Sequence, residues 1–369
     1  MKKDLSVPVP GRVISLDAFR GLTMFLLVAE GAGLYEALQR PEFSGTILGW
    51  LAVQFSHHPW NGLRFWDLVQ PFFMFIVGVA MPFSLGKRRE RGDSEGKILA
   101  HVLYRSFVLF WLGVILHCGY NGKLVFELWN VLTQLSFTYL VAYLLMRYRP
   151  STQIGASAAL LLITEALYRL WSVPGFDQPF VKDHNFGSYV DMLLMGKLNP
   201  GGGWVAFNCV PTACHTIWGV LAGQVLRNRH EAMTKVKKLL LPGLILIVAG
   251  YAMDPITPII KRIATSSFTV VTGGWCLVVL AAMYWLVDMK GYRRWCWFGV
   301  IVGMNSIFIY LFNNTVGPQW MNGFLRIFTE GFLGGLGPAT VDLTNAAVSL
   351  AVSWYLCYWL YKHKILFKI

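Results

Sequence analysis

Charge is scarce in this sequence. Asp, Glu, Lys and Arg make up 14% of its 369 residues, whereas soluble domains carry about 25% charged residues. Acidic residues are the scarcer kind, with 19 Asp and Glu against 32 Lys and Arg and a formal net charge of +13. So low a charged fraction argues against an ordinary soluble domain, whose surface is covered largely by charged side chains.

Several familiar motifs are also missing. The six cysteines fall mostly in apolar stretches and have no zinc-ligand or disulfide-framework spacing, so we predict packing roles for them and no metal site. The sequence contains neither a P-loop nor a G-x-S-x-G motif, which argues against a P-loop nucleotidase and an α/β-hydrolase. No nucleic-acid-binding motif accompanies the positive charge, and we therefore predict no nucleic-acid partner.

Long apolar stretches dominate what remains. Hydrophobic residues make up 55% of the chain, and its mean hydropathy is +0.50. A stretch of ~20 apolar residues can cross the ~30 Å hydrocarbon core of a bilayer. We predict a single all-α domain over residues 1–369, a polytopic transmembrane helical bundle of about ten spans embedded in membrane lipid. The predicted spans are 18–38, 65–86, 98–118, 125–146, 153–173, 205–226, 239–254, 266–288, 296–313 and 343–361.

The distribution of basic residues predicts the orientation. Lys and Arg gather in alternate loops, most densely in 87–97 and 227–238. Because cytoplasmic loops carry the excess of Lys and Arg, we predict that both termini are cytoplasmic. The opposite loops, 39–64, 174–204 and 314–342, are long and rich in Gly, Pro and aromatic residues. We expect these outer loops to shape a pocket.

The segment "SHHPWNGLRFWDLVQPFFMFIVG" places histidines at the outer end of the second span. The Asn61-Gly62 pair predicts a turn, and Asp67 falls in the first turn of the following helix, where a carboxylate is favoured. A neutral imidazole can act as a base or as a nucleophile, so His57 is a candidate reactive group. The alternative is an ordinary interfacial histidine beside Trp60.

The first span carries further ionisable residues. Glu30 lies near mid-span, where a charge is expensive and therefore indicates function, unless it pairs with Arg105 or Arg169 across helices. Asp17 and Arg20 are three residues apart, which favours an ion pair on one helix face. The alternative is that Arg20 binds an anionic ligand from the cytoplasm.

The chain resembles the heparan-α-glucosaminide N-acetyltransferase family and its bacterial relatives. The resemblance begins with "SLDAFRG" and "HHPWNGLRFWDLVQPFFMFIVGVAMPFSL" and continues in "VPTACHTIWGVLAG", "PIIKRIATSSFTVVTGGW" and "VGMNSIFIYLF", so it covers nearly the whole chain. In that family the catalytic histidine lies three residues before the Trp of a Trp-Asn-Gly motif, which here is His57 rather than His58. The chain departs from the family at Glu30, where Asn is usual, and at Ala264, where Trp is usual.

The resemblance implies an activity: transfer of an acetyl group from cytoplasmic acetyl-CoA to the amine of a glucosamine-type sugar at the periplasmic face of a bacterial inner membrane. His57 would either accept the acetyl group or deprotonate the amine. A possible homodimer is implied as well. The alternative function is a transporter of amino sugars or cell-wall sugar fragments without acyl transfer.

The resulting site prediction has three parts. The residues assigned to catalysis are His57, Glu30 and Asp67. Those assigned to acetyl-CoA are Asp17, Arg20, Lys261 and Asn305, and those assigned to the acceptor are Trp60 and Asn61.

Overall fold

A computed structural model describes residues 13–367, and within that range the chain contains helices and no β-strand. This confirms the predicted all-α class. The α-helices are α1 (Ile14–Gly31), α2 (Leu34–Leu38), α3 (Ile47–Gln54), α4 (Val69–Glu90), α5 (Glu95–Asn121), α6 (Val131–Leu145), α7 (Pro150–Leu170), α8 (Phe186–Met195), α9 (Cys209–Arg227), α10 (Ala232–Met253), α11 (Ser266–Met283), α12 (Cys296–Met304), α13 (Ser306–Val316), α14 (Asn322–Leu333) and α15 (Pro338–Lys362). Short 3₁₀ turns are η1 (Pro41–Phe43), η2 (Phe65–Leu68), η3 (Ala206–Asn208) and η6 (Gly334–Leu336), and π-helical turns are η4 (Tyr284–Met289) and η5 (Gly317–Met321).

Helices of membrane-spanning length and composition are present. Five continuous helical stretches qualify, and α12 together with the stretch Ser306–Leu336 makes a sixth if this pair, bent by 78°, is one span. The five are Phe65–Glu90, Glu95–Asn121, Ala206–Arg227, Ala232–Met253 and Ser266–Met289. The chain therefore has the helices of a multi-pass membrane protein. The predicted span over 18–38 corresponds to α1, whose 18 residues include Asp17, Arg20 and Glu30.

Glycines bring the central helices close together. A Cβ at Gly78 of α4 would lie 2.1 Å from the Thr216 carbonyl oxygen of α9, and one at Gly219 would lie 2.2 Å from that of Phe75. Small residues at such positions let helix backbones approach directly, which is how helices associate in lipid. The α4–α9 pair thus fixes the helix that directly follows η2, the 3₁₀ turn that carries Asp67.

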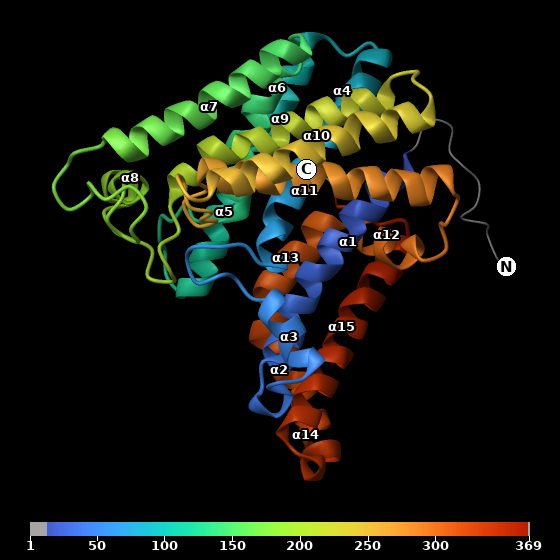
Figure 1. The fold of residues 1–369 in the computed structure, drawn as a ribbon. Coiled ribbons are helices and arrows are strands. Elements are labelled where there is room, and N and C mark those ends of the chain that lie inside the picture. Colours follow the sequence, from blue (N-terminus) through green and yellow to red (C-terminus); the bar gives the residue numbers. More distant parts are fainter. Residues whose placement is uncertain (1–12, 368–369) are drawn as a thin grey trace.

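A second close contact holds α1 against α12. A Cβ at Gly21 would lie 2.2 Å from the Gly299 carbonyl carbon. Beyond α1, Arg40 forms an ion pair with Asp342 near the start of α15. The end of α1 and the start of α15 therefore lie at the same end of the bundle, with α2, α3 and α14 beside them (Figure 1).

Two predicted boundaries are wrong. The predicted outer loop 314–342 is mostly helical, because Phe324, Ile327 and Phe328 recur at helical spacing along α14. The predicted continuous span 296–313 breaks at Asn305, whose backbone leaves the helical conformation (φ −118°, ψ 41°). The Asn305 side chain instead donates to the Ile365 carbonyl and accepts from the Phe367 amide.

Candidate active site

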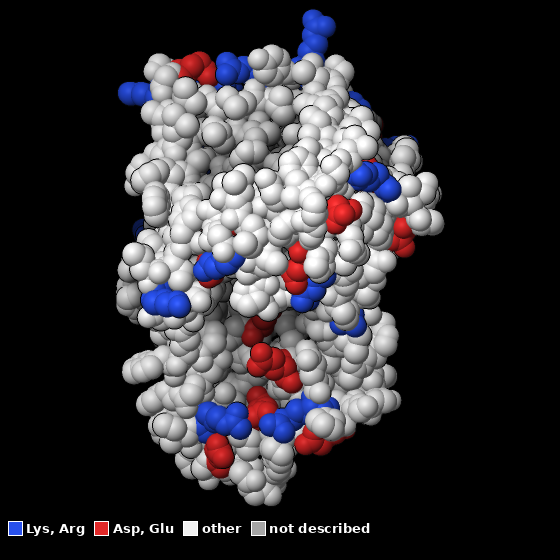
Figure 2. Space-filling view, turned by 90° about the vertical axis from the view of Figure 1, so that its left-hand side faces the viewer, with Lys and Arg blue, Asp and Glu red and all other residues white. Residues whose placement is uncertain are grey.

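A cavity of about 920 Å³ opens between α1, α4, α13 and the long connecting segments. Figure 2 shows one face of the molecule with acidic side chains gathered in a hollow and basic ones beside it. The charged residues that line the cavity are Glu30, Glu36, Arg40, Lys261, Arg326 and Asp342. His57 lines the same cavity, so the cavity joins a histidine to charged side chains from segments far apart in the sequence.

A rigid turn presents His57 to this cavity. Gly62 has φ +143°, a conformation that glycine adopts most easily, and a Cβ there would lie 2.7 Å from the His58 ring. The Gly62 amide donates to the Ile259 carbonyl at 2.8 Å. His58 thus packs inside the turn against Gly62, while His57 faces the cavity, in agreement with the spacing argument.

Asp67 holds the His57 ring. Its Oδ1 lies 2.9 Å from His57 Nδ1, and its Oδ2 accepts from the backbone amides of Arg64 at 2.9 Å and His58 at 3.3 Å. Two amide donors on one oxygen favour the ionised carboxylate, so Oδ1 accepts a hydrogen bond from Nδ1–H. The other ring nitrogen, Nε2, then keeps its lone pair.

Lys261 joins this pair from the distant segment 254–265. Its Nζ lies 3.1 Å from His57 Nδ1 and 3.6 Å from Asp67 Oδ1. Burial and the Lys261 charge lower the pKa of His57 to about 4, and burial lowers the pKa of Lys261 to about 8. The His57 imidazole is therefore neutral over the physiological pH range.

Trp204 supports both groups. Its ring centroid lies 5.4 Å from that of His57 and 5.5 Å from Lys261 Nζ. Sequence analysis missed Trp204, although it lies in the aromatic, glycine-rich stretch "LNPGGGWVAFN" of a predicted pocket-forming loop. The indole excludes water from one side of the imidazole and stabilises the ammonium through its π face.

Comparison with known proteins shows which sequences this chain is similar to. Residues 12–155 match a family model described as a domain of unknown function (DUF5009). The chain is 26% identical to heparan-alpha-glucosaminide N-acetyltransferase of Homo sapiens over 98% of its length and 60% of that protein. The enzyme of the same name from Mus musculus is 26% identical over 97% of the chain and 60% of its own length. The chain is a distant relative of these N-acetyltransferases. It spans about 60% of the length of the N-acetyltransferases it matches.

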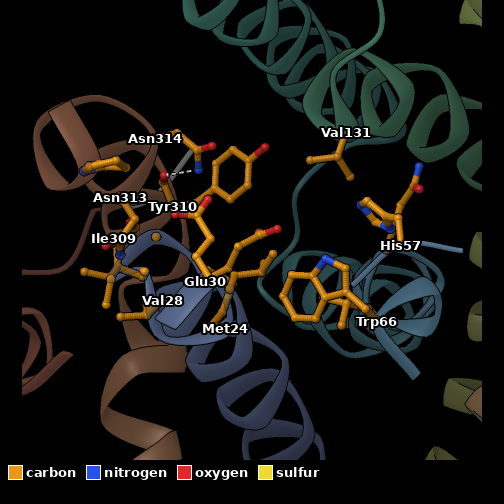
Figure 3. Close-up of a pocket in the computed structure, with 18 of the residues that line it drawn as sticks. Met24, Val28, Glu30, His57, Trp66, Val131, Ile309, Tyr310, Asn313 and Asn314 are labelled. Carbon is orange, nitrogen blue, oxygen red and sulfur yellow. Dashed lines mark hydrogen bonds between the residues drawn. The ribbon is translucent and has the colours of Figure 1, made fainter. Parts of the chain in front are cut away.

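Glu30 is one of the two positions, with Ala264, at which the sequence analysis found a departure from the family pattern. It lies beside Tyr310 and Asn313 in the cavity lining (Figure 3), and it also interacts with the indole of Trp66, which neighbours His57. Asp67 rather than Glu30 thus contacts the imidazole. Glu30 faces the interior of the cavity and acts electrostatically on Lys261.

The predicted alternative partners of Glu30 are engaged elsewhere. Arg169 forms an ion pair with Glu165, one turn away, and donates to the Ile256 carbonyl at 2.6 Å. Arg105 lies over the Tyr139 ring, 4.7 Å from its centroid. The prediction that either arginine neutralises Glu30 is therefore wrong.

The other predicted site residues lie away from the cavity lining. Asp17 and Arg20 pair with each other at 3.7 Å near the start of α1, ten residues or more before Glu30, which corresponds to ~15 Å along a helix. Trp60 donates to the Phe180 carbonyl at 2.8 Å, and Asn61 is exposed in the turn. With Asn305 holding the C-terminal segment, the structure brings together His57, Asp67 and Lys261, with Glu30 across the cavity.

Proposed function

We propose that this chain is a membrane acyltransferase that moves an acetyl group from cytoplasmic acetyl-CoA to the amine of a glucosamine-type sugar at the periplasmic face. The observation that carries this proposal is the His57–Asp67 pair, whose histidine lines the cavity and has Nδ1, rather than Nε2, against the carboxylate. The two N-acetyltransferases to which the chain is similar support the same reaction class. The ten-span bundle with cytoplasmic termini in a bacterial inner membrane, and the homodimer, belong to the same proposal.

His57 can perform the transfer in two ways. In the first, Nε2 attacks the thioester carbonyl, the carbon–sulfur bond breaks, and the CoA thiolate leaves; the acceptor amine then takes the acetyl group from Nε2 and loses a proton. In the second, Nε2 takes a proton from the amine while the amine attacks the thioester directly, the carbon–sulfur bond breaks, and the CoA thiolate leaves. In both routes Asp67 fixes the ring and stabilises positive charge that develops on it.

One part of the cavity lining carries negative charge that would complement the acceptor amine. Glu30 and Glu36 both line it, and the Glu36 charge acts on Glu30. Two carboxylates at one end favour a cation, which suits the ammonium of an amino sugar before its proton is removed. Glu30 would hold that group across the cavity from Nε2.

A transfer assay tests the proposal. Purified protein in detergent should release CoA from acetyl-CoA only when glucosamine is present, and N-acetylglucosamine should appear in equal amount. Acetyl-CoA consumption without an N-acetylated product, or no consumption with any amino sugar, would reject the reaction.

The alternative function, an amino-sugar transporter, has one observation in its favour. The α12–α13 pair is bent by 78° at Asn305, and discontinuous helices are typical of transporter binding sites. Sealed vesicles should separate the two functions. Uptake of labelled glucosamine without acetyl-CoA supports the transporter, whereas product formation that requires acetyl-CoA on the cytoplasmic side supports the acyltransferase.

Sidedness can be tested by thiol labelling in a cysteine-free background. A cysteine replacing Arg91 should be shielded from a membrane-impermeant reagent in intact cells, and one replacing His184 should be labelled. Both positions are exposed, so the membrane alone should decide the outcome. The reverse pattern would reject the proposed orientation.

A further inference from the structure

The feature behind this inference is a three-way contact at Nδ1 of His57. Asp67 Oδ1 lies 2.9 Å from this nitrogen, Lys261 Nζ lies 3.1 Å from it, and the two charged groups lie 3.6 Å apart. In a simple histidine–aspartate pair, the carboxylate raises the basicity of the imidazole because it stabilises the imidazolium. Here an ammonium shares the same carboxylate oxygen.

Burial makes this sharing effective. The side chains of Asp67 and Lys261 are 1% and 7% exposed, so water screens their interaction weakly. The Asp67 carboxylate consequently has a permanent positive neighbour and less charge to offer an imidazolium. Protonating His57 would place a third charged group against this pair.

The other cationic side chains near His57 disfavour its protonation, as Lys261 does. The Arg64 guanidinium donates to the His57 carbonyl oxygen at 3.0 Å, and Arg262 lies over Trp204 at 5.7 Å. The Arg262 charge lowers the pKa of His57, and the Arg64 charge lowers that of its neighbour His58. On the opposite side, Glu30 favours the charged form of Lys261. Asp67 is thus the group that favours a charged His57, and Lys261 directly opposes it.

We propose that Lys261 is a positioning residue that shares the charge of Asp67 and thereby holds His57 as a neutral imidazole. This inference rests on the proposed function, which makes the Nε2 lone pair the reacting group. It assigns Lys261 to the reactive histidine rather than to acetyl-CoA, the role that the resemblance implied. A histidine held neutral keeps its reactive lone pair at mildly acidic pH. An ordinary histidine, with a pKa near ~6.5, would be protonated there and would lose that lone pair.

The test uses diethyl pyrocarbonate, which reacts with neutral imidazole, on the purified full-length protein without substrate. The rate of His57 modification is followed by peptide mass spectrometry from pH 5.5 to 7.5 and corrected for reagent hydrolysis. In the wild type this rate should change less than ~1.5-fold over the range, because His57 stays neutral throughout. In Lys261→Met it should fall at least ~3-fold at pH 5.5 relative to pH 7.5, because Asp67 then acts on the ring unopposed.

Matched variants separate charge from packing. Lys261→Arg keeps the positive charge and should keep the flat profile, whereas Lys261→Gln should behave like Lys261→Met. In the double variant Asp67→Asn/Lys261→Met, the fall should be smaller than in Lys261→Met alone. Size-exclusion chromatography restricts the comparison to folded protein, and Lys261→Gln serves in place of Lys261→Met if the latter does not fold.

The result that would overturn the inference is a flat profile in both neutral variants, or a wild-type profile that already falls at pH 5.5. Because labelling requires no acetyl-CoA, it is independent of the proposed function. Wild-type protein that labels as expected but transfers no acetyl group would reject only the function. Wild-type transfer together with flat profiles in the neutral variants would reject only the role of Lys261.

Discussion

Two clusters in this protein contain the same types of side chain but differ in which of them is exposed to solvent. Each joins a histidine to a carboxylate ten residues later and to a lysine from a distant segment, with a tryptophan ring beside the histidine and the lysine. We call them the His57 cluster (His57, Asp67 and Lys261) and the His117 cluster (His117, Glu127 and Lys197). The distances in the second are 2.7 Å from His117 Nδ1 to Glu127 Oε2 and 2.6 Å from Lys197 Nζ to Glu127 Oε1.

The two clusters differ in which member is exposed. In the His57 cluster the histidine side chain is 35% exposed and the lysine 7%, whereas in the His117 cluster the histidine is 13% exposed and the lysine 39%. The His57 side chain, about a third exposed above a buried ion pair, is more accessible to a substrate than the His117 side chain, which is mostly covered beside an exposed lysine. The residue types and their pairing are therefore insufficient to identify a reactive histidine. What distinguishes the two clusters is whether the histidine or the lysine is the more exposed member.

The His117 cluster has a structural role that the same comparison makes clear. It ties the end of α5 to the loop before α6, next to Trp129, which lines the cavity. Trp129 in turn donates to the buried Asp191 at 2.7 Å, and burial raises the pKa of this carboxyl to about 7. The His117 cluster thus supports one wall of the cavity into which the His57 cluster opens.

The largest expected difference between the clusters is in the histidines themselves. His57→Ala should reduce acetyl transfer by ~1,000-fold or more, since it removes the nucleophile or base. His117→Ala should keep turnover within about 3-fold once folded protein is compared. Product formation is measured on both variants with saturating acetyl-CoA and glucosamine. Equal losses in the two would mean that exposure does not distinguish them.

The second-largest difference in acetyl transfer is expected between variants of the two carboxylates, Asp67 and Glu127. Asp67→Asn should cut transfer by about 100- to 1,000-fold, because an amide no longer fixes Nδ1–H and can impose the other tautomer. Its matched control, Glu127→Gln, should lose far less turnover. A fully active Asp67→Asn protein would show that the imidazole needs no carboxylate partner.

Glu30 tests the opposite wall of the cavity. Glu30→Gln should lower transfer at least ~100-fold, about 2.7 kcal/mol of transition-state stabilisation, because the ammonium of the acceptor loses its counter-charge. If Glu30 binds the acceptor, kcat/KM for glucosamine should carry most of the loss while the KM for acetyl-CoA changes little. A stable variant with unchanged kinetics would remove Glu30 from the site.

A smaller effect is expected at His58, the immediate neighbour of the reactive histidine. His58→Ala should lose less than tenfold in transfer, a barrier change below about 1.4 kcal/mol, because its ring packs on Gly62 away from the cavity. Turnover is compared with His57→Ala in one series of preparations. An inactive His58→Ala beside an active His57→Ala would show that the wrong histidine was chosen.

The smallest effect on turnover should come from Lys197. Lys197→Met leaves Glu127 with one partner fewer in a buried site, which costs about 1–3 kcal/mol of stability. The thermal unfolding midpoint in detergent should fall while the folded fraction turns over at a near-normal rate. A loss of transfer without a change in the midpoint would contradict the structural role of the His117 cluster.

The helical class and the placement of His57 could be predicted from the sequence because both depend on local patterns. Apolar runs predict helices, and a turn followed by a helix start places His57 beside Asp67 ten residues on. Lys261 is 204 residues away from His57, and only the packed bundle brings the two together. Its assignment to acetyl-CoA came from resemblance, which carries no distances.

Other parts of the structure were missed for related reasons. Asn305 breaks a stretch whose composition is apolar throughout, because its side chain binds the C-terminal segment, a contact invisible to a hydropathy window. The charged lining of the cavity at Arg40, Arg326 and Asp342 comes from two predicted loops, 39–64 and 314–342, and no sequence pattern showed that these two loops meet. Glu30 was recognised as unusual, but the wall it occupies depends on the rotation of α1 against α12 and α13.

The hydrogen bond from the Gly62 amide to the Ile259 carbonyl has a mechanical consequence. It joins the turn that carries His57 to the segment that carries Lys261, so a displacement of either one drags the other along. If the cavity takes a sugar, as proposed, its rim has to open at a different place. The Arg40–Asp342–Arg326 ion pairs, partly exposed and shared by three separate segments, are the contacts that such an opening would have to part.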